Sequence, residues 1–322
     1  MRYAFAGALA ASGFAPLNLF PAFILAIAWL FVQTHQDERC RPLDVFMFFL
    51  FMHIVGLYWL AYPLTINIKI HGWLIPMALF FVPAYLSVQL LVAWWLAKKI
   101  SGGILENILL WPSLCCMAVY LYGHFAFGFP WLLPAYIFGQ YEIFLQTISI
   151  YGVYGLSLAT MIISCLCGAS YVFYKKNDRP GAVAAMATAV GLGVFLILFG
   201  VFRTNGTEAS PSNHRARIIQ CNLSQTEKNN PRLSHKNLQK HLKYSYDNSD
   251  LDFIVWPEAS FPYLYHEQLE WFHNTCREFL ENGVYLVAGA IREDRATSKI
   301  YNSVVVIDHL GKNVLNYDKI HL

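Results

Sequence analysis

Repeated apolar runs constrain the fold of this chain more than any other feature, because an α-helix needs about 20 apolar residues to cross a bilayer. Long runs occupy residues 16–33, 43–62, 73–97, 104–123, 148–174 and 182–202. A shorter apolar segment, 3–11, precedes them and is joined to the first through SGFAP at 12–16. The N-terminal residues therefore form either a short span in a hairpin, which we favour, or one broken span. A cleaved signal peptide is excluded because prolines interrupt the first run and five more runs follow.

The distribution of charge divides the chain near residue 202. Residues 1–202 hold 9 Lys and Arg and 6 Asp and Glu, whereas residues 203–322 hold 14 of each kind. We therefore expect a membrane domain at 1–202, with about seven transmembrane helices, and a water-soluble domain at 203–322. The net charge of +3 is small, and no basic stripe is present. A nucleic acid is thus excluded as a partner.

Basic residues alternate between the loops that connect the apolar runs, and this pattern predicts the orientation of the spans. Three alternate loops carry them: Arg39 and Arg41, then Lys98 and Lys99, then Lys175, Lys176 and Arg179. The intervening loops hold Lys69 alone. By the positive-inside rule the three basic loops face the cytoplasm, and the residues after Phe202 lie on the opposite side of the membrane.

The segment 124–147, HFAFGFPWLLPAYIFGQYEIFLQT, is rich in aromatic residues and carries two prolines. It is too interrupted for a regular helix and is typical of the membrane–water interface. It is either an ordinary aromatic belt or a platform that contacts lipid beside an active site. Polar residues near the spans leave a transporter as an alternative. However, Asn67 and His124 lie at span ends, and His53 has no acidic partner nearby.

The second part of the chain alternates short apolar runs with polar helical patterns. Residues 215–222, 252–256, 285–291, 300–308 and 314–317 are predicted strands, and 231–248 and 263–281 are predicted helices. This order indicates an α/β layer fold. Glu258 follows a strand and Pro257, at the strand end where α/β sheets build their sites, so it is either a catalytic carboxylate or a helix N-cap. Lys319 follows the last strand and is by itself an ordinary surface lysine.

The seven cysteines show neither the spacing of metal ligands nor a disulfide framework. We therefore expect no metal and no cofactor. Only Cys221 and Cys276 fall in the second part of the chain. Cys221 lies in a predicted strand and Cys276 on the apolar face of a predicted helix, so both are expected to be packing residues rather than nucleophiles.

Seven short motifs carry a resemblance to a known family. They are GFAPLNLFP (13–21), GFPWLLPAY (128–136), GVYGLSL (152–158), IIQCNLSQ (218–225), VWPEASFP (255–262), YNSVVVID (301–308) and YDKIHL (317–322). Their order resembles that in apolipoprotein N-acyltransferases, and the resemblance covers the whole chain. It implies a polytopic α-helical membrane domain followed by a partial α/β domain of the αββα nitrilase-like (carbon–nitrogen hydrolase) fold. It also implies a bacterial inner (plasma) membrane, with the second domain on the periplasmic side.

By the same resemblance, Glu258 and Lys319 match the first two members of a Glu–Lys–Cys triad. The implied activity is that of an N-acyltransferase acting on lipoproteins. A cysteine thiolate attacks an acyl ester of a phospholipid, and a thioester and a lysophospholipid result. The free α-amine of a diacylglyceryl-cysteine at a lipoprotein N-terminus then takes the acyl group. Glu258 is the expected general base, and Lys319 is expected to stabilise the oxyanion.

The resemblance also implies substrate contacts and partners. The candidate substrate-binding residues are Trp131, Tyr136, Gln220 and Asn222. The expected partners are a phospholipid acyl donor, a diacylglyceryl-lipoprotein acceptor and the membrane. The chain departs from the family at Asn229, where a tryptophan usually follows the Q-x-N-x-x-Q motif by four residues.

The family's nucleophilic cysteine and its final membrane span are expected to lie beyond Leu322. The 322-residue chain alone is therefore predicted to be inactive. Two alternatives stay open from the sequence. One is a non-catalytic, truncated membrane protein that binds lipid or lipoprotein, and the other is a transporter.

Overall fold

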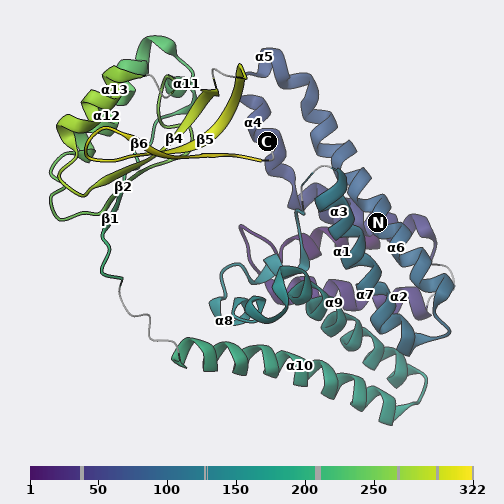
Figure 1. Cartoon of the computed structure of the whole chain (residues 1–322). Coiled ribbons are helices and arrows are strands. Elements are labelled where there is room, and N and C mark those ends of the chain that lie inside the picture. Colours follow the sequence, from purple (N-terminus) through teal and green to yellow (C-terminus); the bar gives the residue numbers. More distant parts are fainter. Residues whose placement is uncertain are drawn as a thin grey trace. The chain divides into compact units, whose positions relative to one another are not determined.

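The computed structural model describes residues 1–36, 40–126, 128, 130–206, 212–266, 269–294 and 297–320. The chain separates into two compact units, Met1–Glu208 and Ala209–Leu322 (Figure 1). Arg39, which was assigned to a cytoplasmic loop, lies outside the described residues. So do His321 and Leu322, the last two residues of the YDKIHL motif.

The first unit is built from helices and short helical turns. Its longer helices are α1 (Arg2–Ala11), α2 (Phe20–Gln36), α3 (Pro42–Gly56), α6 (Val82–Ile100), α7 (Ile104–Leu121), α9 (Ile148–Lys175) and α10 (Arg179–Gly206). Its short turns are η1 (Tyr58–Ala61), α4 (Tyr62–Thr65), α5 (Ile68–His71), η2 (Gly72–Leu74), η3 (Met77–Phe81), η4 (Tyr122–Ala126), η5 (Pro134–Phe138) and α8 (Glu142–Leu145). The segment 124–147 is thus interrupted as its prolines predict.

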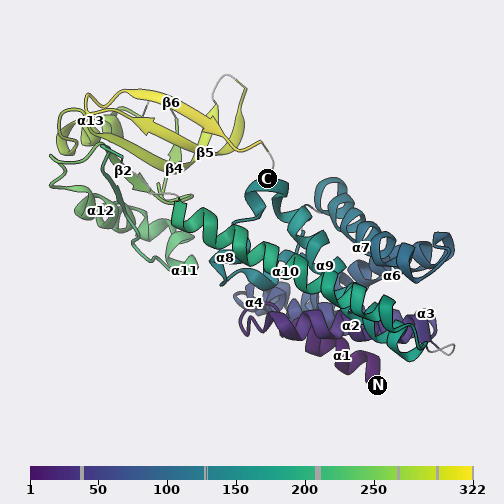
Figure 2. The same cartoon turned by 90° about the horizontal axis from the view of Figure 1, so that it is seen from below.

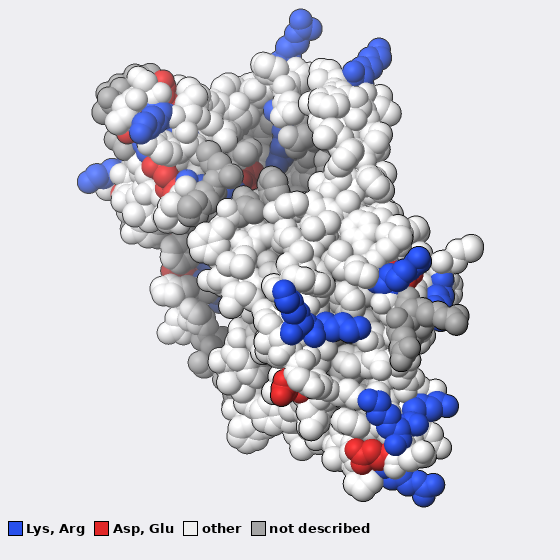
Figure 3. All heavy atoms as spheres, turned by 90° about the vertical axis from the view of Figure 1, so that its right-hand side faces the viewer, with Lys and Arg blue, Asp and Glu red and all other residues white. Residues whose placement is uncertain are grey.

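Several helices of this unit are long and apolar enough to cross a membrane. Among the described residues four qualify: Ile68–Ile100, Ile104–Phe125, Ile148–Lys175 and Arg179–Gly206. A fifth arises if the pair Pro42–Gly56 and Tyr58–Thr65, bent by 55°, is counted as one span. Many apolar side chains are exposed on these helices, and the face in Figure 3 is largely uncharged, with Lys and Arg in a few groups. This surface is typical of a protein that lies in lipid, and the chain is a membrane protein.

Small residues set the packing of the membrane unit. α9 packs against α2, α7 and α10, while α1 packs against α3. A Cβ at Gly7 would collide with the backbone carbonyl of Phe48, and one at Gly168 would lie 2.6 Å from the carbonyl oxygen of Ala28. These two glycines therefore allow the α1–α3 and α2–α9 backbones to approach closely, as small residues do in membrane helices.

The second unit holds one mixed sheet of six strands. They are β1 (Ala216–Ile218), β2 (Phe253–Trp256), β3 (Leu264–Tyr265), β4 (Tyr285–Asp294), β5 (Lys299–Ile307) and β6 (Asn313–Asp318). The order is β1-β2-β4-β5-β6, and β3 pairs with β4. β1, β2 and β4 run parallel, whereas β4, β5 and β6 form an antiparallel meander. The carboxyl ends of β1 and β2 therefore meet at one edge of the sheet.

Helices cover one face of this sheet (Figures 1 and 2). The helical elements of the unit are α11 (Gln225–Lys228), η6 (Pro231–Leu233), α12 (Ser234–Ser245) and α13 (Glu270–Phe279). Leu238 of α12 and Phe272 of α13 share a buried core with Ile254, Leu286 and Val305 of the strands. Because side chains alternate along a strand, Val255, Val287 and Val304 point to the opposite face. The architecture is an α/β layer that follows a helical membrane unit, as expected.

The structure corrects two local predictions. The helix predicted over 263–281 begins only at Glu270, because Leu264 and Tyr265 pair with Ile291 and Arg292 as a short parallel strand. The strand predicted over 215–222 ends at Ile218. There the chain leaves the sheet, and Asn222 takes a left-handed φ of 48°.

Candidate functional site at the strand ends

Glu258 stands on a tight turn directly after β2. The turn is anchored on β4, since the backbone N–H groups of Ser260 and Phe261 both donate to the carbonyl of Gly289, at 3.0 and 3.1 Å. Only a glycine fits at 289, because a Cβ there would collide with the carbonyl of Pro257 and the Cα of Glu258. The described residues after Glu258 form this turn and then β3, so Glu258 does not cap a helix.

Lys319 and Asn302 converge on the Glu258 carboxylate. Lys319 Nζ lies 3.6 Å from Glu258 Oε1, and the Asn302 side-chain amide donates a hydrogen bond to the same oxygen. Lys319 and Asn302 are neighbours in the β5–β6 hairpin, where Lys319 N donates to Asn302 O at 2.9 Å. The hairpin therefore delivers a cation and a neutral donor to the carboxylate that follows β2.

A partly buried ion pair fixes the end of β6 next to Lys319. Arg292 Nε and Nη2 donate to the two oxygens of Asp318, at 3.0 and 2.7 Å. Ser303 Oγ donates to Asp318 Oδ1 at 2.6 Å. The hydrogen bonds from Arg292, and then those from Ser303, hold the pKa of Asp318 below its ordinary value of 3.8. The three strands β4, β5 and β6 are thereby tied together beside the Glu258–Lys319 pair.

Two hollows meet at Glu258. One is an open hollow of about 350 Å³ over the helix-free face of the sheet, and its floor includes Val255, Val287 and Val304. Both Glu258 and Lys319 line it. The other hollow, about 640 Å³, lies beside the loop after β1 and around α11. A charged pair at the rim of an apolar floor suits a substrate with a polar reacting group and an apolar tail.

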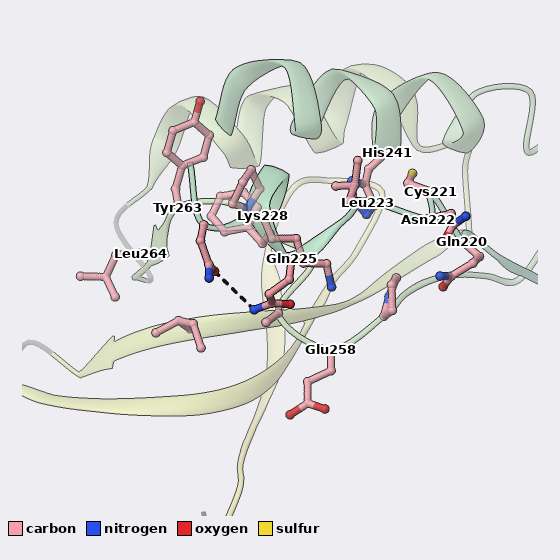
Figure 4. A pocket seen from close by; sticks show the side chains of 16 residues that line it. Gln220, Cys221, Asn222, Leu223, Gln225, Lys228, His241, Glu258, Tyr263 and Leu264 are labelled. Carbon is pink, nitrogen blue, oxygen red and sulfur yellow. Dashed lines mark hydrogen bonds between the residues drawn. The ribbon is translucent and has the colours of Figure 1, made fainter. Parts of the chain in front are cut away.

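Gln220 and Asn222 line the larger hollow, together with Gln225, Lys228 and Asn229. Figure 4 shows that the Glu258 carboxylate points away from these side chains, so Glu258 borders this hollow mainly through its backbone. The structure thus places Gln220 and Asn222 beside the turn that carries Glu258, but the Glu258 carboxylate faces away from them.

Neither cysteine of the second unit is arranged for nucleophilic attack. The Cys276 side chain is buried under α13, and burial raises its pKa. Cys221 is also buried, and burial raises its pKa although the Lys240 ammonium opposes this shift. A thiol held protonated is a poor nucleophile. Among the described residues, no group of three His, Cys, Asp or Glu could hold a metal ion.

Trp131 and Tyr136 lie in the membrane unit. Trp131 packs edge-on against Trp59, with ring centroids 5.0 Å apart, and lines an apolar groove of about 550 Å³. The other walls of this groove come from η1, α4, η3 and α6 and include Leu60, Phe81 and Tyr85. Tyr136 does not line it and is 42% exposed on η5.

The sequence reasoning missed Asn302. A signal was available, because asparagine is depleted from strand interiors and here interrupts an apolar strand. That signal marks an unusual polar side chain, but it does not reveal that the side chain bonds Glu258. This contact depends on the pairing of β4 with β5, which no local pattern specifies.

Comparison with known proteins identifies both units. The profile described as apolipoprotein N-acyltransferase N-terminal domain matches residues 6–166, half of the chain, and the carbon-nitrogen hydrolase profile matches residues 215–322. The curated relatives include apolipoprotein N-acyltransferases of Rhodopseudomonas palustris and Bradyrhizobium diazoefficiens, each 29% identical over 98% of this chain. Another, from Rickettsia bellii, is 25% identical over 98% of the chain. The chain spans 62–63% of the length of these three relatives.

Proposed function

The chain belongs to the apolipoprotein N-acyltransferase family, and from this premise we propose its activity. It takes part in moving an acyl chain from a phospholipid to the α-amine of an N-terminal diacylglyceryl-cysteine of a lipoprotein. The curated relatives that match 98% of the chain carry the name of this activity. The observation that carries the proposal within the molecule is the convergence of Glu258 and Lys319, 3.6 Å apart, at the strand ends.

The pair has the chemistry that acyl transfer needs. Glu258 serves as the general base, which removes a proton first from the attacking thiol and later from the acceptor amine. Lys319 stabilises the oxyanion of each tetrahedral intermediate. The reaction joins the acyl group to a thiol and releases a lysophospholipid, and aminolysis of the thioester then regenerates the thiol. We assign neither Cys221 nor Cys276 as that thiol, because both are buried and held protonated.

The apolar groove beside Trp131 supports a phospholipid as the acyl donor. Apolar and aromatic side chains line it, and it opens on a unit whose helices lie in lipid. A groove of this chemistry takes an acyl chain, because lipid tails are the apolar molecules available at that depth. We propose that Trp131 contacts the donor, and that Tyr136, Gln220 and Asn222 contact other parts of the substrates.

The distribution of basic residues supports a location in the bacterial inner membrane. Lys98 and Lys99 end α6, Lys175 ends α9 and Arg179 begins α10. By the positive-inside rule these ends face the cytoplasm. We propose that residues 1–202 form the membrane domain, with about seven spans, and that residues 203–322 belong to a carbon–nitrogen hydrolase domain on the periplasmic side.

A labelled transfer reaction tests the activity. The assay uses the protein encoded by the complete gene, with any residues beyond 1–322, and we call this protein the intact gene product. In detergent or vesicles it is mixed with phosphatidylethanolamine that carries a labelled acyl chain and with a diacylglyceryl-cysteine peptide. Mass spectrometry should find the label on the peptide as an amide, together with lysophospholipid. A peptide with an acetylated α-amine is the matched control and should stay unlabelled. Release of labelled free fatty acid, without any labelled peptide, would instead indicate a lipid hydrolase.

A further inference from the structure

We propose that Asn302 is a positioning residue that orients the Glu258 carboxylate for proton transfer. This inference rests on the proposed role of Glu258 as the general base. It starts from the hydrogen bond that the Asn302 side-chain amide donates to Glu258 Oε1. Because a carboxylate oxygen only accepts, the group that faces it must be the NH₂ of the asparagine.

Both contacts to the carboxylate fall on one oxygen. Asn302 donates to Oε1, and Lys319 Nζ lies 3.6 Å from the same atom. Among the described residues none donates to Oε2 of Glu258. One oxygen is therefore held while the other keeps its lone pairs, and the free oxygen is the one that accepts the proton.

Glu258 needs this orientation because its own packing does not supply it. Its side chain is 68% exposed. A glutamate in such surroundings samples several rotamers, and holding one of them costs conformational entropy that a bond must offset. The ion pair with Lys319 is also exposed, so solvent weakens it. The hydrogen bond from Asn302 is exposed too, but it is directional and comes from a paired strand, so it is the stronger constraint on the direction of the carboxylate.

The strand that carries Asn302 is rigid for reasons visible in the sheet. Asn302 lies in β5, opposite Ile291 of β4, and its carbonyl accepts the backbone N–H of Lys319. On either side of this point, Ser303 and Arg292 bind Asp318. Asn302 and Lys319 are therefore held in register, so that both reach Glu258 together.

A neutral donor also fits the chemistry better than a second cation. A hydrogen bond to the charged form of a carboxylate favours that form, and a nearby positive charge favours it more strongly. With Lys319 already present, a second cation would make Glu258 a weaker base. Asn302 fixes the geometry and adds no charge.

The test compares the intact gene product with four variants in the acyl-transfer assay. Asn302→Leu keeps the size but removes the donor. We expect kcat/KM to fall about 10- to 100-fold, as for misplaced catalytic groups. The fall should appear in kcat rather than in KM, because a misdirected base slows proton transfer. Asn302→Asp should lower kcat at least as far, since it sets a second carboxylate against Glu258 in place of the donor.

The matched control is Asn313→Leu in the same hairpin. Asn313 donates to the hydroxyl of Tyr265, at 2.7 Å, and to Asn316. Loss of its side-chain amide should lower the melting temperature and leave kcat unchanged. A purely structural role of Asn302 predicts the same pattern for Asn302→Leu, and that result would overturn the inference. Should Asn302→Leu fail to fold, the isosteric Asn302→Asp decides, because a lower kcat supports the inference and a wild-type kcat overturns it.

Glu258→Gln separates this inference from the function on which it rests. If Glu258→Gln abolishes transfer while both Asn302 variants keep the wild-type kcat, the positioning role is wrong and the proposed function stands. If Glu258→Gln transfers acyl groups at the wild-type rate, the proposed base is wrong and the role of Asn302 falls with it.

Discussion

The two units of this protein differ in where the partners of their polar side chains lie along the sequence. In the membrane unit, several buried hydroxyl groups bond within their own helix: Ser157, Thr160 and Ser164 each donate to the carbonyl four residues earlier in α9. The buried His53 of α3 bonds to Ser87 of the neighbouring helix α6. In the α/β unit, ionisable side chains from strands far apart in sequence converge on one edge, at Glu258 and Lys319.

This difference follows from the solvent of each unit. In lipid an unsatisfied polar group costs several kcal/mol, so hydroxyl groups in the spans bond to the backbone of their own helix and serve its packing. At the edge of a sheet in water, exposed charges cost little and can remain available. We infer that the membrane unit supplies substrate access and the strand ends supply the chemistry. The predictions below test that division, beginning with the largest expected effect.

Lys319→Met should reduce acyl transfer by a factor of about 10²–10³, which is typical for the loss of one oxyanion-stabilising group. Methionine keeps most of the side-chain length but removes the charge. Lys312→Met, an exposed lysine of the same hairpin, is the control and should leave the rate unchanged. Equal rates in the two variants would show that Lys319 is only a surface residue.

Much of the fold was accessible from the sequence, because its signals are local. The apolar runs predicted α7, α9 and α10 to within a few residues at both ends, and the run 73–97 contains most of α6. Strand pairing is not local. The segment 263–281 keeps helical spacing throughout, yet Leu264 and Tyr265 gain more from pairing with β4. Glu258 and Lys319 were named from family motifs, whereas the approach of Asn302 needed the β4–β5 register.

Gly289→Ala should disturb the site through sterics alone. The added Cβ would collide with the Pro257 carbonyl and force the Glu258 turn away from β4. We expect a loss of about 1–3 kcal/mol of stability, as for other overpacked sites, together with reduced transfer. Gly191→Ala on α10 is the counterpart in the membrane unit, where a Cβ meets open space. Thermal melts in detergent should show that only the Gly289 variant is less stable.

Ser157→Ala should destabilise the membrane unit without changing the chemistry. The fully buried Ser157 hydroxyl accepts the backbone N–H of Ala135, at 3.1 Å. Its removal leaves that N–H unpaired, which costs about 1–3 kcal/mol. Ser149→Ala, which removes an exposed hydroxyl, should change stability by less than about 0.5 kcal/mol. A shift in the pH dependence of transfer for Ser157→Ala would contradict the division between the units.

The smallest effect concerns pH and Asp318. The folded-state pKa of Asp318 lies below its ordinary value of 3.8 because Arg292 and then Ser303 bond the carboxylate. A carboxylate whose pKa is lower in the folded state than in the unfolded state stabilises the fold at pH values above its unfolded-state pKa. This stability is lost as the pH falls through the folded-state pKa. The melting difference between wild type and Asp318→Asn should be constant near neutral pH and shrink below about pH 4. If the melting difference stayed the same at lower pH, the Arg292–Asp318 ion pair would not be its cause.

The most direct test of the account is the transfer rate of Glu258→Gln in the intact gene product, beside Glu278→Gln as an exposed control on α13. Glutamine keeps the shape of the side chain and can still occupy the turn after β2, but it cannot accept the proton. The account predicts a rate lower by a factor of about 10²–10⁴, an unchanged melting temperature, and a wild-type rate for the control. A wild-type rate for Glu258→Gln would contradict the assignment of the reaction to the strand ends.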